Sequence, residues 1–159
     1  KIDDLLSPQD FVQELAFSKA AHIAIKLAKP SVVIGADTIV VLDDLKLNKP
    51  TDEADAFQLL SRLSGRTHKV YTGISLFNSK TGAYIKDYQV TDVTFRELSE
   101  SEIKDYIAGG SPMDKAGAYG IQDDFGSVFV SHINGCYYNI VGLPLELTYR
   151  RIKEFIDEL

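Results

Sequence analysis

The sequence predicts an α/β or mixed α+β sheet protein, because segments with helical spacing alternate with segments of strand character along its 159 residues. Residues 31–41 (SVVIGADTIVV) form a continuous apolar run rich in β-branched side chains, which is typical of a strand buried on both faces. Residues 70–77 and 83–95 flank the turn-forming sequence Asn78–Gly82, so we expect a hairpin there. The chain contains no internal repeat and no linker-like stretch, and its length suits a single domain over residues 1–159.

The first helix is expected to begin at Ser7-Pro8, a cap residue followed by a proline at the first helical position. Helical spacing continues to about Ala28, and Lys29-Pro30 ends the helix because a proline disfavours helical backbone at the residue before it. The positions that follow this spacing are Phe11, Leu15, Ala16, Lys19 and Ile23.

Two more helices follow from capping signals. The second begins at Thr51–Glu53 and stops near Gly65, a residue suited to a helix end. Its apolar side consists of Ala56, Leu59, Leu60 and Leu63. Ser99 predicts the cap of the third helix, with Glu102 at the capping-box position, and Gly109–Pro112 ends that helix.

The C-terminal part of the chain is expected to form a hairpin and a helix. Residues 127–133 and 137–141 are predicted as two short strands around Asn134-Gly135, a strong hairpin turn. Residues 145–159 are predicted as the last helix.

Composition excludes several classes of protein. The formal net charge of −6 argues against sequence-independent binding to nucleic acid, although a few local cations and a metal can still hold a small anion. No apolar run approaches the length of a membrane span, and residues 1–10 lack the apolar stretch of a signal peptide. The single cysteine, Cys136, fits a reducing compartment, so we expect a cytoplasmic protein.

Asp37 is the most informative polar residue, because it lies inside the apolar run at 31–41. Burying a carboxylate costs several kcal/mol unless a metal, a cation or hydrogen bonds compensate its charge. A functional carboxylate that reaches a ligand is one interpretation, and a structural aspartate that caps a turn after the strand is the other.

Two further segments carry candidate ligand-binding residues. Lys49 precedes a stiffening proline and a helix, where it can meet a phosphate as a point charge or remain a solvated surface lysine. Asp114–Gln122 (DKAGAYGIQ) is rich in small residues that let the backbone approach a ligand, and it can equally be a surface loop. Asp114 could join Asp37 on a metal, since Mg²⁺ favours one or two carboxylates together with substrate phosphates.

The remaining polar candidates are weaker. Arg66, in the segment 64–68 (SGRTH) between a helix and a strand, can bind an anion or lie in solvent. The three histidines are too far apart in sequence to form a metal-ligand pattern, and Cys136 lies in no nucleophile motif.

Six short segments share one order along the chain and carry a resemblance to a known family. They are Ile34–Val40 (IGADTIV), Asn48–Pro50 (NKP), Leu63–His68 (LSGRTH), Tyr71–Gly73 (YTG), Asp114–Gln122 (DKAGAYGIQ) and Asn139–Pro144 (NIVGLP). Together they resemble the Maf family of nucleotide pyrophosphatases, and the segments 64–68 and 71–73 resemble its dTTP/UTP-hydrolysing branch more than its 7-methyl-GTP branch.

The resemblance implies an elongated α/β fold with a mixed sheet, related to house-cleaning inosine triphosphatases, with the active site in a cleft. It implies hydrolysis of nucleoside triphosphates to the monophosphate and pyrophosphate, assisted by Mg²⁺ or Mn²⁺, in a protein that can form a homodimer. By this match Asp37 is the proton acceptor, Lys49 contacts phosphate, and Thr38 and Gln122 bear on substrate choice. Asp114 and Lys115 fall in the same site.

One departure from the family pattern concerns the N-terminal end. Family members begin with a strand and a Ser-x-Ser-Pro-Arg-Arg loop whose serine and arginines bind the phosphates, whereas no arginine follows Ser7-Pro8 here. We therefore expect an N-terminally incomplete Maf-like domain, active as the full-length protein but weak or inactive as this segment alone, because arginine–phosphate contacts are strong.

Two other functions remain open from the sequence. One is a non-catalytic nucleotide-binding regulator of cell division or septum formation, a role also linked to the family. The other is a regulatory domain fused to a larger enzyme. The presence of Asp37, Lys49 and Gln122 argues against the non-catalytic regulator, whereas a natural absence of the arginine loop would argue for it.

Overall fold

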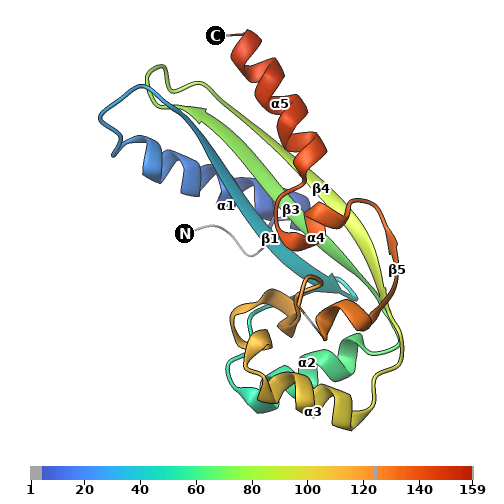
Figure 1. Ribbon diagram of the computed structural model, residues 1–159. Coiled ribbons are helices and arrows are strands. Elements are labelled where there is room, and N and C mark those ends of the chain that lie inside the picture. The colour runs from blue at the N-terminus through green and yellow to red at the C-terminus, as the bar shows by residue number, and fades with distance from the viewer. Residues whose placement is uncertain (1–4, 124, 159) are drawn as a thin grey trace. The chain divides into compact units, whose positions relative to one another are not determined.

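The computed structural model describes residues 5–123 and 125–158 and contains a five-stranded antiparallel sheet flanked by helices (Figure 1). In chain order the elements are α1 (Pro8–Ala24), β1 (Val32–Leu42), β2 (Leu45–Leu47), α2 (Glu53–Leu63), β3 (Thr67–Asn78), β4 (Tyr84–Phe95), α3 (Glu100–Ala108), β5 (Val130–Asn134), α4 (Tyr137–Val141) and α5 (Leu145–Asp157). Short 3-10 turns lie at Ser111–Asp114, Ala116–Ala118 and Gly126–Val128. The strand order is β2-β1-β3-β4-β5, which confirms the predicted α/β class.

The chain divides into two compact units, each made of separate stretches of sequence. The first unit comprises Lys1–Thr38, Tyr71–Val90 and Tyr138–Leu159, and the second comprises Ile39–Val70 and Thr91–Tyr137. The long strands β1, β3 and β4 each contribute residues to both units. Whether the chain acts as one domain stays a prediction.

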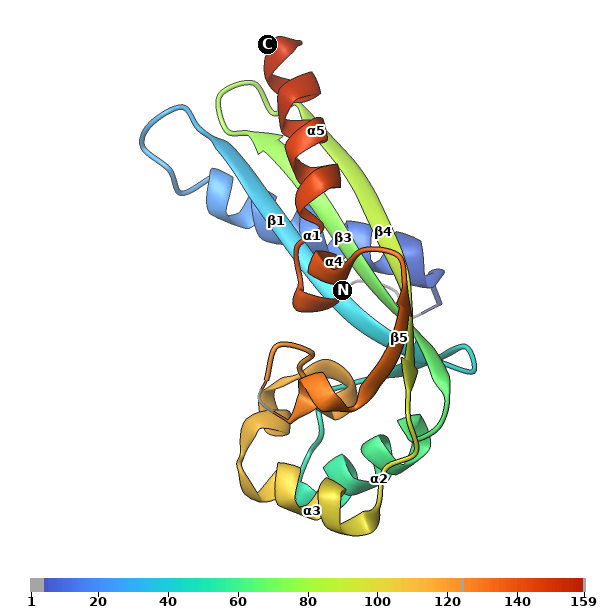
Figure 2. The ribbon, with the colours of Figure 1, turned by 45° about the vertical axis from the view of Figure 1, so that its right-hand side comes forward.

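In the first unit, α1 lies on one face of the sheet, and α4 and α5 lie on the other (Figures 1 and 2). The Ser7 hydroxyl caps α1 by accepting a hydrogen bond from the backbone N–H of Asp10, at 3.2 Å. An ion pair between Arg151 and Asp87, at 2.8 Å, joins α5 to β4.

Small residues bring the backbone of α1 directly onto the sheet. A Cβ atom added at Gly35 would lie 2.1 Å from the carbonyl oxygen of Ala16, and one added at Gly73 would lie 2.2 Å from that of Val12. The buried residues of α1 are therefore Val12, Ala16, Ala20 and Ala24. The helical spacing in the sequence agrees with this face at Ala16 but not at Ile23, which is 48% exposed. The reason is that close backbone packing selects small side chains instead of large apolar ones.

The second unit confirms two helices in detail. The buried residues of α2 are the four predicted ones, Ala56, Leu59, Leu60 and Leu63. Gly65, with a φ of 68°, follows the end of α2, and Asp52 caps its start. The predicted capping box of Ser99 and Glu102 begins α3.

The predicted hairpin around Asn134-Gly135 is wrong in its second strand, because residues 137–141 form the helix α4. The side chain of Thr91 redirects the chain: its Oγ1 accepts a hydrogen bond from the Cys136 N–H at 3.0 Å and donates one to the Cys136 carbonyl at 3.2 Å. Gly135, with a φ of 134°, leaves room for Thr91 there. These contacts replace the backbone pairing of a hairpin. The first strand also begins later than expected, at Val130.

The strand β1 is less buried than its apolar sequence predicts. Residues 39–42 are buried, but Ile34 is 46% exposed and most of the residues from 32 to 38 are partly exposed. Within residues 32–38 only Gly35, which packs against α1, is buried, so residues on both faces of this stretch keep contact with solvent. Among the described residues, no helix combines the length and apolar character needed to cross a membrane.

Candidate active site

Asp37 lies in β1 and forms an ion pair with a lysine from α1. The Lys19 ammonium lies 2.5 Å from Asp37 Oδ1 and also donates a hydrogen bond to the carbonyl of Ala36, at 3.2 Å. The side chain of Asp37 is 17% exposed, whereas that of Lys19 is 55% exposed. The cation that a largely buried carboxylate requires is thus supplied by the protein itself.

Lys19 was not among the candidate residues from the sequence. The signal that could have found it is its position in α1, where it stands between the small buried residues Ala16 and Ala20. A helix that packs its backbone on a sheet brings the polar side chains at the margin of the contact close to the strand.

Thr38, the next residue of β1, points to the opposite face from Asp37. Its Oγ1 lies 2.8 Å from Thr72 Oγ1, and the Thr72 hydroxyl donates to the carbonyl of Asn139 at 2.9 Å. Because Thr72 has one proton and uses it there, Thr38 is the donor in the contact between the two threonines. Thr38 therefore takes part in a hydrogen-bonded chain that connects β1 and β3 to α4.

In the second unit, the Lys49 segment adjoins the glycine-rich segment. The N–H of Gly117 donates a hydrogen bond to the carbonyl of Asn48, at 3.3 Å, and Lys49 itself is exposed. Gly117 has a φ of 70°, and a Cβ there would lie 3.1 Å from Val40 Cγ1. The structure thus brings together two of the segments that the sequence singled out, with Lys49 accessible to a ligand.

Lys115 is held by several acceptors. Its ammonium donates to the Ser111 carbonyl at 2.8 Å and lies 3.2 Å from Asp114 Oδ1 and 3.4 Å from Asp123 Oδ2. Burial acts to raise the pKa of Asp123, but hydrogen bonds from Ser111 and Tyr106 and the charge of Lys115 outweigh it and lower that pKa below its usual value. The positive charge of Lys115 is therefore shared between two carboxylates.

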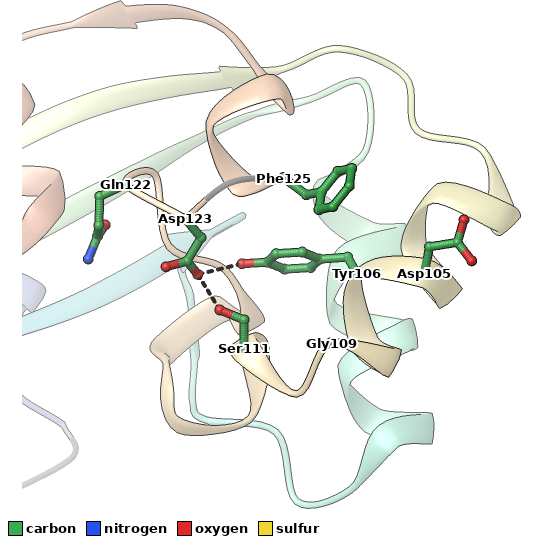
Figure 3. Close-up of a pocket in the computed structure, with 7 residues that line it drawn as sticks. All are labelled: Asp105, Tyr106, Gly109, Ser111, Gln122, Asp123 and Phe125. Carbon is green, nitrogen blue, oxygen red and sulfur yellow. Dashed lines mark hydrogen bonds between the residues drawn. The ribbon is translucent and has the colours of Figure 1, made fainter.

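Gln122 is exposed and lies at the edge of a cavity of about 480 Å³ in the second unit (Figure 3). The cavity is lined by Asp105, Tyr106, Gly109, Ser111, Gln122, Asp123 and Phe125. Two of these residues are carboxylates and none is a cation, so the cavity does not suit the phosphates of an anionic ligand.

Arg66 is paired with a neighbouring loop residue. Its guanidinium lies 2.6 Å from Asp43 Oδ1, and both side chains are substantially exposed. This hydrogen bond raises the pKa of Arg66 and lowers that of Asp43. A ligand that binds Arg66 has to share it with Asp43 or displace Asp43, and solvent makes such an exchange inexpensive.

His68 is a structural residue of the core. It is 1% exposed, its Nε2 lies 2.6 Å from the hydroxyl of Tyr119, and its ring packs edge-on against Phe95. Burial lowers the pKa of His68 to about 4, so the ring is neutral at physiological pH.

The described residues contain no group of three or more histidine, cysteine, aspartate or glutamate side chains arranged to hold a metal ion. Asp37 belongs to the first unit and Asp114 to the second. The Asp114 side chain is 82% exposed and contacts Lys115. A metal shared by Asp37 and Asp114 stays a prediction.

Comparisons with known proteins show the family of this chain and several similar proteins. A sequence model of the Maf family, described as Maf-like protein, matches residues 2–155. A dTTP/UTP pyrophosphatase of Clostridium perfringens strain 13 is 48% identical over 147 residues, which cover 92% of this chain and 76% of that protein. Proteins of the same name from Clostridium botulinum strain Alaska E43 and Bacillus cytotoxicus are 47% and 49% identical, and they cover 96% and 94% of this chain and 78% and 76% of their own lengths.

Proposed function

The chain belongs to the Maf family, and from this premise we propose that it is a nucleoside triphosphate pyrophosphatase. Its substrates are dTTP, UTP and related modified pyrimidine nucleotides, and its products are the nucleoside monophosphate and pyrophosphate. The observation that carries the proposal is the similarity to relatives named dTTP/UTP pyrophosphatase at 47–49% identity over more than nine-tenths of the chain.

Asp37 is the proposed general base. A water molecule attacks the α-phosphorus, its proton passes to the Asp37 carboxylate, and the bond from the α-phosphorus to the bridging oxygen breaks to release pyrophosphate. Two features of Asp37 support this role: its side chain is only 17% exposed, and it is held by Lys19 at 2.5 Å. A base fixed in this way needs little reorganisation during the reaction.

The remaining proposed roles concern binding. Lys49 and Lys115 contact the phosphates as point charges, and Arg66 contributes a further cation once it exchanges Asp43 for the substrate. Thr38 and Gln122 bear on the choice of nucleobase. Their roles follow from the resemblance, and the exposure of Lys49 and Gln122 is compatible with it.

We propose Asp37 and, by the resemblance, Asp114 as ligands of a hard divalent cation such as Mg²⁺ or Mn²⁺. Lys19 occupies Oδ1 of Asp37, and within the described residues Oδ2 has no hydrogen-bond partner, so it can serve as a ligand. Asp114 offers a second, exposed carboxylate. Mg²⁺ bound in proteins keeps several waters and needs only one or two carboxylates beside the substrate phosphates. When bound, the cation would neutralise charge on the phosphates.

The composition supports two further parts of the proposal. One cysteine in the sequence fits a cytoplasmic enzyme, and the net charge of −6 fits a small-molecule substrate better than a nucleic acid. We also propose that the protein associates as a homodimer, which light scattering of the purified protein tests directly.

The testing experiment measures pyrophosphate release by the full-length protein from a panel of nucleoside triphosphates with Mg²⁺ or Mn²⁺. The Asp37→Asn variant keeps the shape of the side chain but removes the base. Asp87→Asn is the matched control, because Asp87 is an ion-paired aspartate of the same unit that contacts Arg151. Release from dTTP or UTP that disappears only with Asp37→Asn supports the proposal. Nucleotide binding without release from any nucleotide contradicts it and favours a regulatory nucleotide-binding protein.

A further inference from the structure

The hydroxyl of Tyr106, on α3, closes the turn that carries Gln122. The N–H of Gly120 donates to the Tyr106 hydroxyl at 3.1 Å, and this hydroxyl donates to Asp123 Oδ2 at 2.9 Å. The N–H of Asp123 in turn donates to the carbonyl of Gly120, at 3.1 Å. One side chain thus holds both ends of the turn, and Gln122 lies between those ends.

The surroundings of the hydroxyl keep this arrangement rigid. Ser111 donates a second hydrogen bond to Asp123 Oδ2, at 2.7 Å (Figure 3). A Cβ atom at Gly120 would lie 2.7 Å from the same oxygen, so Asp123 packs tightly against the turn. Tyr106 is 3% exposed and packs edge-on against Phe129, with 5.0 Å between ring centroids. Burial raises the pKa of Tyr106, so its hydroxyl stays protonated and remains a donor.

Gln122 is exposed, and its side chain points away from Asp123 and Tyr106 (Figure 3). Tyr106 therefore holds the backbone on either side of Gln122 and does not itself contact a ligand of the Gln122 amide. An amide side chain has a donor end and an acceptor end, and it distinguishes a carbonyl from an amino group only if it is held in one orientation. A turn that is free to move would let the amide present either end.

We propose that Tyr106 is a positioning residue for Gln122, and that it thereby sets how well the protein distinguishes uracil and thymine from cytosine. Uracil and thymine present a carbonyl and an N–H at two adjacent ring positions, where cytosine presents an amino group and an unprotonated nitrogen. This is the difference that an oriented amide can read. The inference rests on the proposed function in one respect, namely that Gln122 contacts the base of the nucleotide.

The test is the Tyr106→Phe variant, which removes the hydroxyl and keeps the ring. The readout is the ratio of kcat/KM for UTP to that for CTP. Beside it stands the ratio of the dissociation constant for CTP to that for UTP, measured by calorimetry in the Asp37→Asn background. We expect both ratios to fall by about tenfold, in line with the loss of one oriented polar contact. Circular dichroism and thermal denaturation check that the variant folds.

Tyr119→Phe is the matched control. It removes another buried tyrosine hydroxyl of the same unit, one that bonds His68 instead of the Gln122 turn. The UTP-to-CTP ratio should remain as in the wild type, even if the variant is less stable. A purely structural role for Tyr106 predicts that Tyr106→Phe and Tyr119→Phe behave alike and lower activity on both nucleotides in the same proportion, which would overturn the proposal.

Gln122→Ala completes the design. If Tyr106 acts through Gln122, Tyr106→Phe causes no further loss of selectivity in the Gln122→Ala background, whereas an equal additional loss there would refute the link. The binding ratio separates this inference from the proposed function. Selective binding without turnover contradicts only the pyrophosphatase, and normal turnover with an unchanged ratio in Tyr106→Phe contradicts only the role of Tyr106.

Discussion

Lys19 of α1 places its ammonium 2.5 Å from the Asp37 carboxylate of β1 and holds a second hydrogen bond to the carbonyl of Ala36. The proposed base thus takes its position from a helix and not only from its own strand. Of the two charges, the lysine is the more exposed, so it can be removed without leaving a cavity in the core.

We expect Lys19→Met to lower kcat/KM by roughly 100-fold, the lower end of what a positioned general base contributes. The substitution leaves the Asp37 carboxylate without its cation while retaining much of the apolar stem of the lysine. Lys86→Met is the matched control, since Lys86 also joins a strand of the first unit to α1, through Glu14. The measurement is the rate of pyrophosphate release by both variants. Equal losses of kcat/KM would show that Lys19 has only a structural role.

Gly35→Ala should destabilise the protein by about 2 kcal/mol or more, because the new methyl group would overlap the carbonyl oxygen of Ala16, which backbone packing fixes in place. Gly109→Ala is the control: its φ is −70°, and the nearest atom to an added Cβ is 3.4 Å away. Urea denaturation of the two variants measures the difference. A cost at Gly35 no larger than at Gly109 would mean that α1 moves readily away from β1.

His68 predicts a pH dependence of stability. Burial holds its pKa at about 4 in the folded protein, below the usual value of 6.5. As the pH falls below about 6.5, the unfolded chain takes up a proton that the folded protein refuses, so stability is lost progressively until about pH 4. The loss over this range is about 3 kcal/mol.

The measurement is the free energy of unfolding at pH 7 and pH 5, in the wild type and in His68→Phe. The variant loses the hydrogen bond to Tyr119 but cannot titrate, so its stability should fall less between the two pH values. Subtracting the change in the variant from the change in the wild type removes the contribution of the carboxylates, which both proteins share. Parallel slopes would show that His68 becomes protonated without unfolding.

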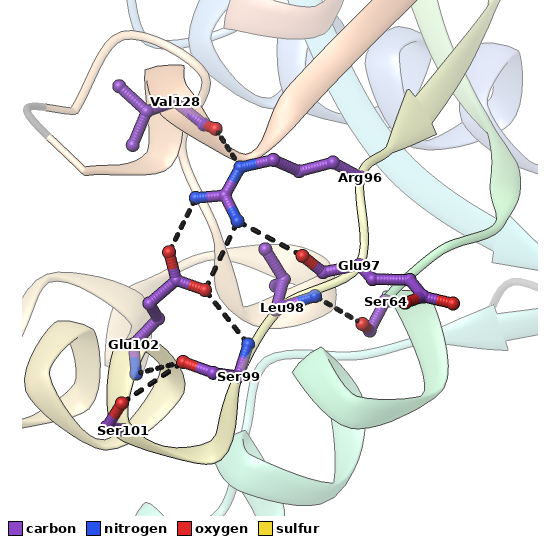
Figure 4. A network of polar contacts seen from close by, with 8 residues as sticks. All are labelled: Ser64, Arg96, Glu97, Leu98, Ser99, Ser101, Glu102 and Val128. Carbon is purple, nitrogen blue, oxygen red and sulfur yellow. Dashed lines mark hydrogen bonds and ion pairs between the residues drawn. The ribbon is translucent and has the colours of Figure 1, made fainter.

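Ser99→Ala should destabilise the protein by about 1 kcal/mol, the usual cost of losing a helix cap. Ser99 Oγ accepts a hydrogen bond from the Glu102 N–H at 3.2 Å, while Arg96 binds the Glu102 carboxylate at 2.8 Å (Figure 4). Ser101→Ala, in the same helical turn, should change stability by less than about 0.5 kcal/mol. Thermal denaturation compares the two variants, and equal effects would mean that the capping box adds nothing at Ser99.

The sequence predicted best the elements whose signals are local. The α2 face was correct because large apolar residues mark it, and α3 was correct because the Ser99 capping box needs only neighbouring residues. The α1 face was partly missed because alanines carry little hydrophobic signal, and their role depends on Gly35 and Gly73 in distant strands. Residues 137–141 were misassigned because a side chain of β4, Thr91, decides the path of the chain there.

In the candidate site too, the sequence reveals residues with a local signal but not the contacts between distant segments. Asp37 could be proposed as a site residue because a carboxylate in an apolar strand is unusual in its immediate context. Its partner Lys19 lies 18 positions away, and the helical spacing placed it in the first helix without marking it as a site residue. Only the packing of α1 on the sheet brings the two together. The pairing of Arg66 with Asp43 likewise depends on a turn whose geometry was not evident from the sequence.

The chain passes between the two units at residues 38–39, 70–71, 90–91 and 137–138. Three of these passages occur within strands, where a cut would separate residues that share one backbone ladder. Neither unit therefore corresponds to a continuous stretch of the gene, and no single truncation can yield one of them intact.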